Sequence, residues 1–134
     1  MREVTSVFQI DVMSRTPPYE QIIEQFEQFV MMDILQPGDK MISVRQLSVQ
    51  LSVNPNTIQK AYSEMDLRGY ITSVPGKGCF VTPDAKDIVR REHRDKMKEI
   101  KEIVRSLILA GVTKEELIEL INEEYEGREA YDQS

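Results

Sequence analysis

Apolar residues between Ser43 and Gly69 recur every three or four positions, which is the spacing of side chains along one face of an α-helix. They form two short stripes, the first made of Val44, Leu47 and Leu51 and the second made of Ile58, Ala61, Tyr62 and Met65. Ser52 and Val53 lie between the stripes. The pattern therefore predicts two short helices joined by a tight turn.

The residues at the helix ends support this prediction. Ser43 is suited to cap the first helix, and Gln46 three positions later completes the sequence of a capping box. Asn54 is a favourable cap for the second helix, and Pro55 occupies its first helical position, where no amide donor is needed. Gly69 is suited to end that helix.

Two runs rich in β-branched and aromatic residues follow, at residues 70–74 and 79–82. The tetrapeptide Pro75-Gly76-Lys77-Gly78 lies between them, and its glycines permit a tight turn. Two helices and a hairpin in this order predict a winged helix-turn-helix domain, an architecture that commonly reads duplex DNA.

The outer face of the second helix has the composition of a DNA-reading surface. The amides of Asn56 and Gln59 can bond base edges, the methyl group of Thr57 can meet a thymine methyl, and Lys60 can contact phosphate. Lys77 places a positive charge at the hairpin tip. Each feature alone also fits an ordinary solvated helix or turn, but their succession favours DNA binding.

Residues 43–81, SVRQLSVQLSVNPNTIQKAYSEMDLRGYITSVPGKGCFV, resemble the winged-helix domain of the GntR family of bacterial transcriptional regulators. The segments PPYEQI at residues 17–22 and LQPGDK at residues 35–40 also match this family. The segment VNPNTIQKAY, together with a short two-helix tail, is most similar to the YtrA-type subfamily. One departure is Met41-Ile42, where the family usually has Leu-Pro, and it predicts a less rigid approach to the first helix.

The resemblance implies that Arg45 contacts DNA and that residues 56, 57 and 59 face the major groove. With the helix caps and the hairpin tip, the predicted DNA-binding set is Ser43, Arg45, Asn54, Asn56, Thr57, Gln59, Lys60, Gly76, Lys77 and Gly78. The YtrA-type resemblance also implies a repressor, often acting on its own operon with transporter genes. It leaves open whether an unidentified small-molecule effector is a further partner.

The formal net charge of −6 is unusual for a DNA-binding protein, but the charge is unevenly distributed. Residues 1–33 hold two basic and six acidic residues, residues 34–83 five and three, and residues 84–134 ten and fourteen. Only the predicted reading region is net positive, and binding follows the local field. The small excess of basic residues in this region implies few phosphate contacts per subunit. Two subunits bound together would therefore strengthen DNA binding.

The segments before the first stripe predict an arm and a helix. Phe8, Ile10 and Val12 alternate with polar residues, which indicates an extended strand against the body or a partner. A helix is expected over residues 17–33, with a core-facing stripe made of Tyr19, Ile22, Ile23, Phe26 and Val30.

After Pro83 the sequence predicts two more helices. Residues 84–110 form one long charged pattern with an apolar heptad seam made of Met97, Ile100, Val104 and Leu107. Gly111 is expected to break this helix, and Thr113 with Glu116 forms a second capping box. The last helix is expected to end at Gly127 and to be followed by a disordered tail.

These patterns divide the chain into a reading domain with its arm, residues 1–83, and a C-terminal dimerisation and effector region, residues 84–134. A pendant helical hairpin with this much apolar surface favours pairing with a second copy. The alternative is a hairpin folded back on its own domain. The predicted dimer interface consists of Met97, Ile100, Val104, Leu107, Leu117 and Ile121.

The sequence argues against an enzyme. It has one histidine and no phosphate-binding, paired-cysteine or serine-nucleophile motif, so that no catalytic residue, metal site or cofactor is predicted. Cys79 alone excludes a disulfide framework and is interpreted as a small buried hydrophobe, and His93 as an interface residue. No signal peptide or membrane-length apolar run is present, which predicts a cytoplasmic protein without a membrane partner.

The predicted fold is mainly α with a small β-hairpin wing, a winged helix-turn-helix domain followed by a two-helix dimerisation hairpin. The predicted function is sequence-specific transcriptional regulation by a homodimer on a palindromic site in double-stranded DNA. The alternative is an architectural or adaptor protein that binds DNA without sequence preference and recruits a partner through its C-terminal helices.

Overall fold

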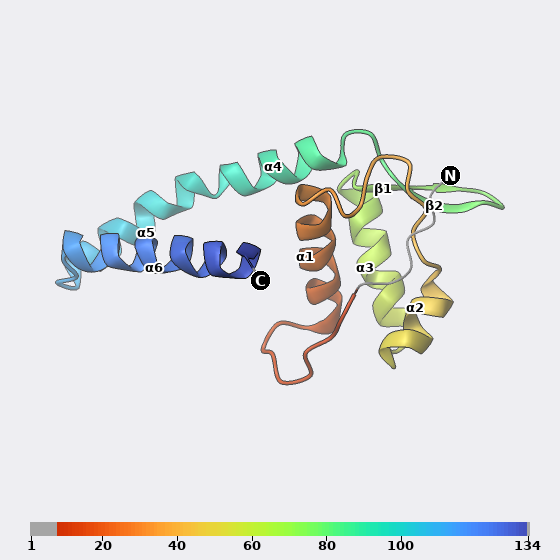
Figure 1. Ribbon diagram of the computed structural model, residues 1–134, viewed down its shortest axis with the longest axis horizontal. Coiled ribbons are helices and arrows are strands. Elements are labelled where there is room, and N and C mark those ends of the chain that lie inside the picture. The colour runs from red at the N-terminus through yellow and green to blue at the C-terminus, as the bar shows by residue number, and fades with distance from the viewer. Residues whose placement is uncertain (1–7, 134) are drawn as a thin grey trace. The chain divides into compact units, whose positions relative to one another are not determined.

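The computed structural model describes residues 8–133, with the side chains of residues 8–127 (Figure 1). The chain divides into two compact units, Met1–Arg94 and Asp95–Ser134. The elements are α1 (Pro18–Met31), α2 (Val44–Leu51), α3 (Pro55–Leu67), β1 (Ile71–Val74), β2 (Gly78–Val81), α4 (Ala85–Asp95), α5 (Met97–Leu109) and α6 (Lys114–Gln133). Helices with one two-stranded hairpin confirm the predicted fold class.

The arm before α1 is irregular and does not form the predicted strand. Phe8 is buried and packs edge-on against Phe29 of α1, with ring centroids 5.3 Å apart. Gln21 and Gln25, on successive turns of α1, hydrogen-bond to backbone groups of the arm. Because these side chains satisfy the backbone of the arm, its alternating pattern needs no neighbouring strand.

The helix-turn-helix consists of α2 and α3, and both predicted N-caps are confirmed. Ser43 Oγ accepts a hydrogen bond from the Gln46 amide at 3.1 Å, and Asn54 Oδ1 accepts one from the Asn56 amide at 2.8 Å. Ser52 is in the left-handed region with φ 54°. These local contacts fix where each helix begins.

Buried hydroxyl groups hold the backbone around α2. Ser48 Oγ donates to the Val53 carbonyl at 2.6 Å and closes the turn. The Tyr62 hydroxyl donates to the Ile42 carbonyl, also at 2.6 Å. Burial raises the pKa of Tyr62, which keeps this hydroxyl protonated. A buried hydrogen bond therefore anchors the segment that leads into α2. It offsets the loss of rigidity expected because Met41-Ile42 stands where the family usually has Leu-Pro.

The wing is formed by β1 and β2, which pair antiparallel from Ile71 opposite Val81 to Val74 opposite Gly78. At its tip the Lys77 amide donates to the Val74 carbonyl at 2.9 Å, and Gly76 has φ 76°. A positive φ at the third turn residue after a proline is the arrangement of a type II turn.

The segment before α2 adds a short third edge to the wing. The Met41 amide donates to the Cys79 carbonyl at 2.8 Å, the Gly38 amide donates to the Val81 carbonyl at 2.8 Å, and Lys40 pairs with Phe80. This pairing runs into the cap of α2, so the wing and the start of α2 are tied together.

Helix α4 packs within the first unit. Ala85 and Val89 are each 1% exposed, and a Cβ atom added to Gly69 would lie 3.1 Å from Ile88 Cδ1. The division between the units thus follows α4 and not Pro83, where the composition of the sequence changes. The predicted single helix over residues 84–110 is two helices, with Lys96 between them.

The core of the first unit lies among α1, α2, α3, α4 and the wing. Its largest fully buried side chains are Tyr70, Phe26, Ile22, Leu47, Ile58, Met65, Ile71 and Val89. All of the predicted stripe of α3 is buried. The helical spacing therefore identified the buried face of α3, whereas Val44 and Leu51 of the predicted α2 stripe are only half-buried.

In the second unit, the turn between α5 and α6 is built on Gly111, which has φ 88°. The Val112 amide donates to the Leu107 carbonyl and the Gly111 amide to the Ile108 carbonyl, both at 3.0 Å, which is a Schellman motif. This confirms the predicted break.

The predicted start of α6 agrees with the structure, but its predicted end does not. The capping box is confirmed, because the Glu116 amide donates to Thr113 Oγ1 at 3.2 Å and the Thr113 amide donates to Glu116 Oε2 at 3.0 Å. The predicted end at Gly127 is wrong, as is the disordered tail, since α6 continues to Gln133. One glycine costs a helix only about 1 kcal/mol and does not by itself end it.

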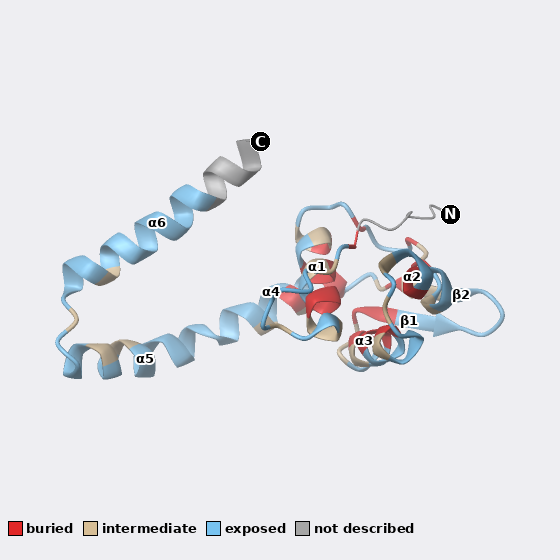
Figure 2. Cartoon of the chain, turned by 90° about the horizontal axis from the view of Figure 1, so that it is seen from below, coloured by how far each residue is buried: buried red, intermediate tan, exposed pale blue. Residues whose placement is uncertain are grey.

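Burial differs sharply along the chain (Figure 2). In the first unit the helices have buried faces, whereas α5 has no buried residue. Figure 2 colours α5 and the described part of α6 mostly as exposed. Within the described residues, no helix is long and apolar enough to cross a membrane.

Candidate nucleic-acid interface

Ser43 and Arg45 lie at the start of α2. The Ser43 hydroxyl caps the helix, and Arg45 is exposed. An exposed guanidinium beside free helix amides creates a positive field at this end of α2. This arrangement is suited to a phosphate group.

Asn54, Asn56 and Thr57 lie at the start of α3. Asn54 Oδ1 is engaged with the Asn56 amide, while the side chain of Asn56 is exposed and Thr57 is half-buried. Residues at the N-terminus of the second helix are those that reach base edges in helix-turn-helix proteins. Asn56 is therefore the predicted residue best placed for base contacts.

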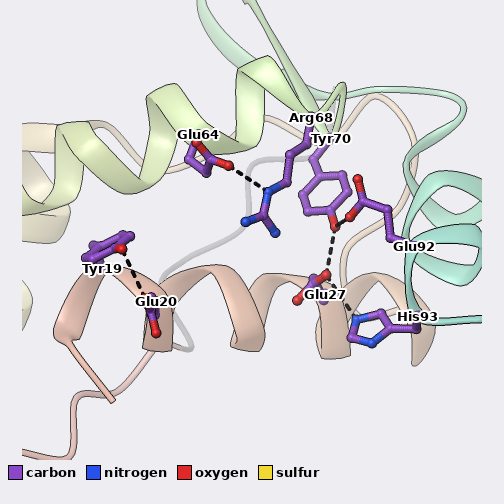
Figure 3. Close-up of polar contacts among 8 residues, drawn as sticks. All are labelled: Tyr19, Glu20, Glu27, Glu64, Arg68, Tyr70, Glu92 and His93. Atoms are coloured by element: carbon purple, nitrogen blue, oxygen red, sulfur yellow. Dashed lines mark hydrogen bonds and ion pairs between the residues drawn. The ribbon is translucent and has the colours of Figure 1, made fainter. Parts of the chain in front are cut away.

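Gln59 and Lys60 are exposed, but both side chains already have neighbours. Gln59 Nε2 donates to Ser63 Oγ at 3.0 Å. Lys60 Nζ lies 3.8 Å from the ring centroid of Tyr19 on α1, a cation–π contact. The Tyr19 hydroxyl donates to Glu20 at 3.0 Å (Figure 3), and this bond raises the pKa of Tyr19.

The sequence interpreted Tyr19 only as a core residue, so its contact with Lys60 was missed. No local pattern marks it, because the two residues come from α1 and α3. The contact holds the lysine toward α1 while leaving it exposed.

The tip of the wing presents Gly76, Lys77 and Gly78 to solvent. Gly76 has φ 76° and Gly78 has φ 116°, which few other residues adopt. A Cβ atom on Gly78 would also lie 3.2 Å from Lys40 Cε. Lys40 thus runs beside the wing, and it is a further positive charge that the sequence interpretation overlooked.

The fold brings the three predicted segments into one unit. The Met41–Cys79 hydrogen bond ties the wing to the start of α2, and the turn at Ser52 ties α2 to α3. Figure 1 shows α3 between α1 and α2, with the hairpin projecting from the same unit. Backbone contacts therefore connect the three segments within the first unit.

Of the acidic groups in this region, one is ion-paired and one is buried, whereas Asp66 of α3 is exposed. Glu64 forms an ion pair with Arg68 at 3.0 Å toward the end of α3, and Asp39 is buried, where it accepts the Gln36 amide at 2.8 Å. The exposed cations of this region are Arg45, Lys60 and Lys77. The local field is thus positive near the starts of α2 and α3 and the wing tip.

The predicted dimer residues remain largely uncovered in the single chain. Met97, Ile100 and Ile121 are exposed at 64%, 47% and 54%. The others, Val104, Leu107 and Leu117, are half-buried. These side chains are available to a partner.

Cys79 and His93 are placed differently from their sequence interpretations. Cys79 is only half-buried, and its Sγ lies 3.4 Å from Ser73 Oγ. His93, interpreted as an interface residue, has Nε2 3.0 Å from Glu27 Oε2 within the first unit.

The structure also contains a polar cluster that the sequence did not reveal (Figure 3). The Tyr70 hydroxyl lies 2.7 Å from Glu27 Oε2 and 2.5 Å from Glu92 Oε2. Glu27 also contacts His93. We call these four residues the polar clamp. They come from α1, the residue preceding β1, and α4, so no sequence spacing brings them together.

Comparison with known proteins identifies relatives that match most of the chain. Residues 18–81 match the family described as bacterial regulatory proteins, gntR family. The chain is 41% identical over 121 residues to the HTH-type transcriptional repressor YtrA of Bacillus subtilis (strain 168), covering 87% of this chain and 91% of that relative. It is also 41% identical over 117 residues to the HTH-type transcriptional regulator YhcF of the same organism, covering 85% of this chain and 94% of that relative.

Solved structures agree with these matches. YtrA from Sulfolobus acidocaldarius, a GntR-family transcription factor, is 33% identical with a TM-score of 0.62, covering 77% of this chain and 99% of that one. A transcriptional regulator from Oenococcus oeni is 28% identical with a TM-score of 0.65, covering 85% of this chain and 95% of that one. The similarity therefore extends beyond the winged helix.

Proposed function

Because this chain belongs to the gntR family of bacterial regulatory proteins, we propose that it is a homodimeric repressor that reads a palindromic operator. Members of the family are DNA-binding transcriptional regulators and not enzymes. A winged helix-turn-helix of this kind binds double-stranded DNA. The operator symmetry, the dimer and repression are the proposed steps.

The exposed start of α3 is the observation that carries base reading in this proposal. Asn56 and Gln59 offer amides, and Asn56 stands at the helix end that enters a major groove. Arg45, Lys60 and Lys77 would neutralise phosphates around that groove. The caps Ser43 and Asn54 would fix the helix ends at the duplex.

The uncovered apolar face of α5 and α6 supports a dimer. Met97, Ile100, Ile118 and Ile121 are each about half exposed or more, which is costly in water for neighbouring apolar groups. A second copy would cover this surface and present two reading helices to successive major grooves. In this proposal the dimer is formed by the region after Pro83, with α4 packed on the head.

Repression is proposed from the relative named a transcriptional repressor in Bacillus subtilis. A small-molecule effector acting on the C-terminal helices would work by changing the separation or angle of the two heads, since only differential binding to two arrangements shifts them. A transporter operon as the target follows from the YtrA-type resemblance alone.

The test is selection of bound sites from random duplex DNA by the full chain. The proposal expects a consensus with two-fold symmetry. Recovery of duplexes without a consensus would contradict it and favour the alternative, an architectural or adaptor protein that recruits a partner through its C-terminal helices.

A further inference from the structure

We propose that Lys40 is a DNA-contacting residue of the wing, whose ammonium group binds a phosphate at the edge of the minor groove that the hairpin tip enters. The set of DNA-contacting residues predicted from the sequence did not include it. The inference rests on the DNA binding proposed above, but it needs neither the dimer nor the palindrome.

Lys40 belongs to the short third edge of the wing. It pairs antiparallel with Phe80 of β2, and beside this pair the Met41 amide donates to the Cys79 carbonyl at 2.8 Å. Backbone hydrogen bonds therefore fix the position of Lys40 relative to β2.

The Lys40 side chain runs toward the tip of the hairpin. Paired residues on neighbouring strands point to the same face of a sheet, and so do residues two positions apart on one strand. Lys40, Phe80 and Gly78 thus share one face. A Cβ atom added to Gly78 would lie 3.2 Å from Lys40 Cε, so the lysine stem extends from the level of Phe80 to that of Gly78, next to the exposed tip (Figure 2).

The two faces of the wing differ in charge. On the opposite face, the Ser73 hydroxyl donates to the carboxylate of Asp66 at 3.4 Å. The strand residues that share the face of Lys40 carry no charge, and they are Thr72, Val74, Gly78 and Phe80. The positive charge of Lys40 is therefore not opposed by an acidic residue on its own face of the wing.

Lys40 is also available for a new ionic contact. Arg68, Lys86 and Arg90 have carboxylate partners, whereas within the described side chains of residues 8–127 no ion pair includes Lys40. Lys40 is half-buried, as expected for a stem that lies along the wing. Binding a phosphate would therefore break no existing ion pair in this region.

The dimensions of the wing and of DNA fit this contact. Neighbouring strands lie about 5 Å apart, which places the backbone of Lys40 one strand to the side of β2. The minor groove of B-DNA is about 6 Å wide, and its edges are the two phosphate backbones. When the tip with Lys77 enters the groove, a cation beside β2 lies level with the backbone at one edge.

The experiment compares Lys40→Met and Lys40→Arg with the wild-type full chain on a duplex containing one half-site of the selected consensus. Methionine keeps an unbranched stem against Gly78 but removes the charge, and arginine keeps the charge. Arg91→Met, at an exposed residue of α4, is the matched control for loss of one positive charge.

Two measurements are made on each chain. The first is the slope of the logarithm of the binding constant against the logarithm of salt concentration. The second is the loss of affinity when single phosphates of the duplex are replaced, one at a time, by neutral methylphosphonates. The second measurement locates the contact, because a variant that lacks the contacting cation is insensitive to the loss of that phosphate.

We expect Lys40→Met to reduce the salt slope by about one and to abolish the sensitivity to one methylphosphonate position at the edge of the minor groove. Lys40→Arg and Arg91→Met should keep the wild-type slope and the wild-type phosphate profile. A wild-type slope and profile in Lys40→Met would overturn the inference while leaving the DNA-binding proposal intact. A wild-type chain that binds no duplex DNA would overturn both.

Discussion

In residues 8–94 most of the apolar side chains selected by helical spacing are buried, whereas in residues 95–127 each of those selected is half-buried or exposed. Ile58 in α3 is fully buried, and Ile118 in α6 is 45% exposed. Both were selected by the same helical spacing of apolar residues. The difference shows that the head covers most of its apolar residues within the single chain, whereas the C-terminal helices leave theirs accessible, as the proposed dimer requires.

The comparison also separates two kinds of specificity. Contacts at the starts of α2 and α3 would read one half-site, and the C-terminal unit would decide how many half-sites are read together. The following predictions test the contribution of each region.

The largest effect is expected from breaking the heptad seam with Val104→Glu and Leu107→Glu together. Unpaired carboxylates in an apolar interface should yield a monomer in sedimentation, because burying them is costly. Affinity for the palindrome should fall by about 10²–10⁴-fold through lost avidity, with little change for a half-site.

The matched control for the seam is Leu109→Glu, on the same helix at a residue 91% exposed. It should leave the chain dimeric. If the seam variant stays dimeric, the interface lies elsewhere. If it is monomeric yet binds the palindrome normally, the tail is not coupled to recognition.

The second prediction uses the same substitution in both regions. Ile58→Ala should lower the free energy of unfolding of the head by about 2–5 kcal/mol, because it leaves a cavity in a packed core. Ile118→Ala, measured in the monomeric seam variant, should change it by less than about 0.5 kcal/mol. Denaturant titration measures both. Equal losses would show that the C-terminal helices have a core of their own.

The third prediction concerns base reading within the head. Asn56→Ala or Gln59→Ala should cost about 1–3 kcal/mol at particular base pairs and relax the preference there. Lys60→Ala is the comparison variant, since loss of a phosphate contact weakens binding to all sequences alike. Binding to a panel of single-base operator variants measures the effect. A uniform loss for Asn56 or Gln59 would make it a backbone contact.

The smallest effect is expected from Arg45→Ala. Removing one phosphate contact should reduce the slope of the logarithm of the binding constant against the logarithm of salt concentration by about one per subunit. The fold should stay intact. Titrations over a series of salt concentrations measure this slope. An unchanged slope would remove Arg45 from the DNA-contacting set.

The sequence predicted those features whose signals are local. Ser43, Asn54 and Thr113 cap helices where their positions indicate, and Gly69 and Gly111 end them. Such signals involve residues only a few positions apart, so one sequence contains all the information needed.

Features that depend on distant residues were not predictable. The arm was assigned to a strand because its alternation could not reveal that Gln21 and Gln25 hold its backbone. The polar clamp and the Tyr19–Lys60 contact join helices far apart in the sequence. The packing of α4 on the head was equally hidden, since its charged composition resembles that of the helix that follows.

The most direct test of the account is the binding of the full chain to a selected palindrome and to its isolated half-site under the same salt conditions, with stoichiometry measured in the same titration. The account predicts two chains on the palindrome, bound at least about a hundredfold more tightly than the half-site. One chain per duplex, or equal affinity for palindrome, half-site and unrelated DNA, would contradict it.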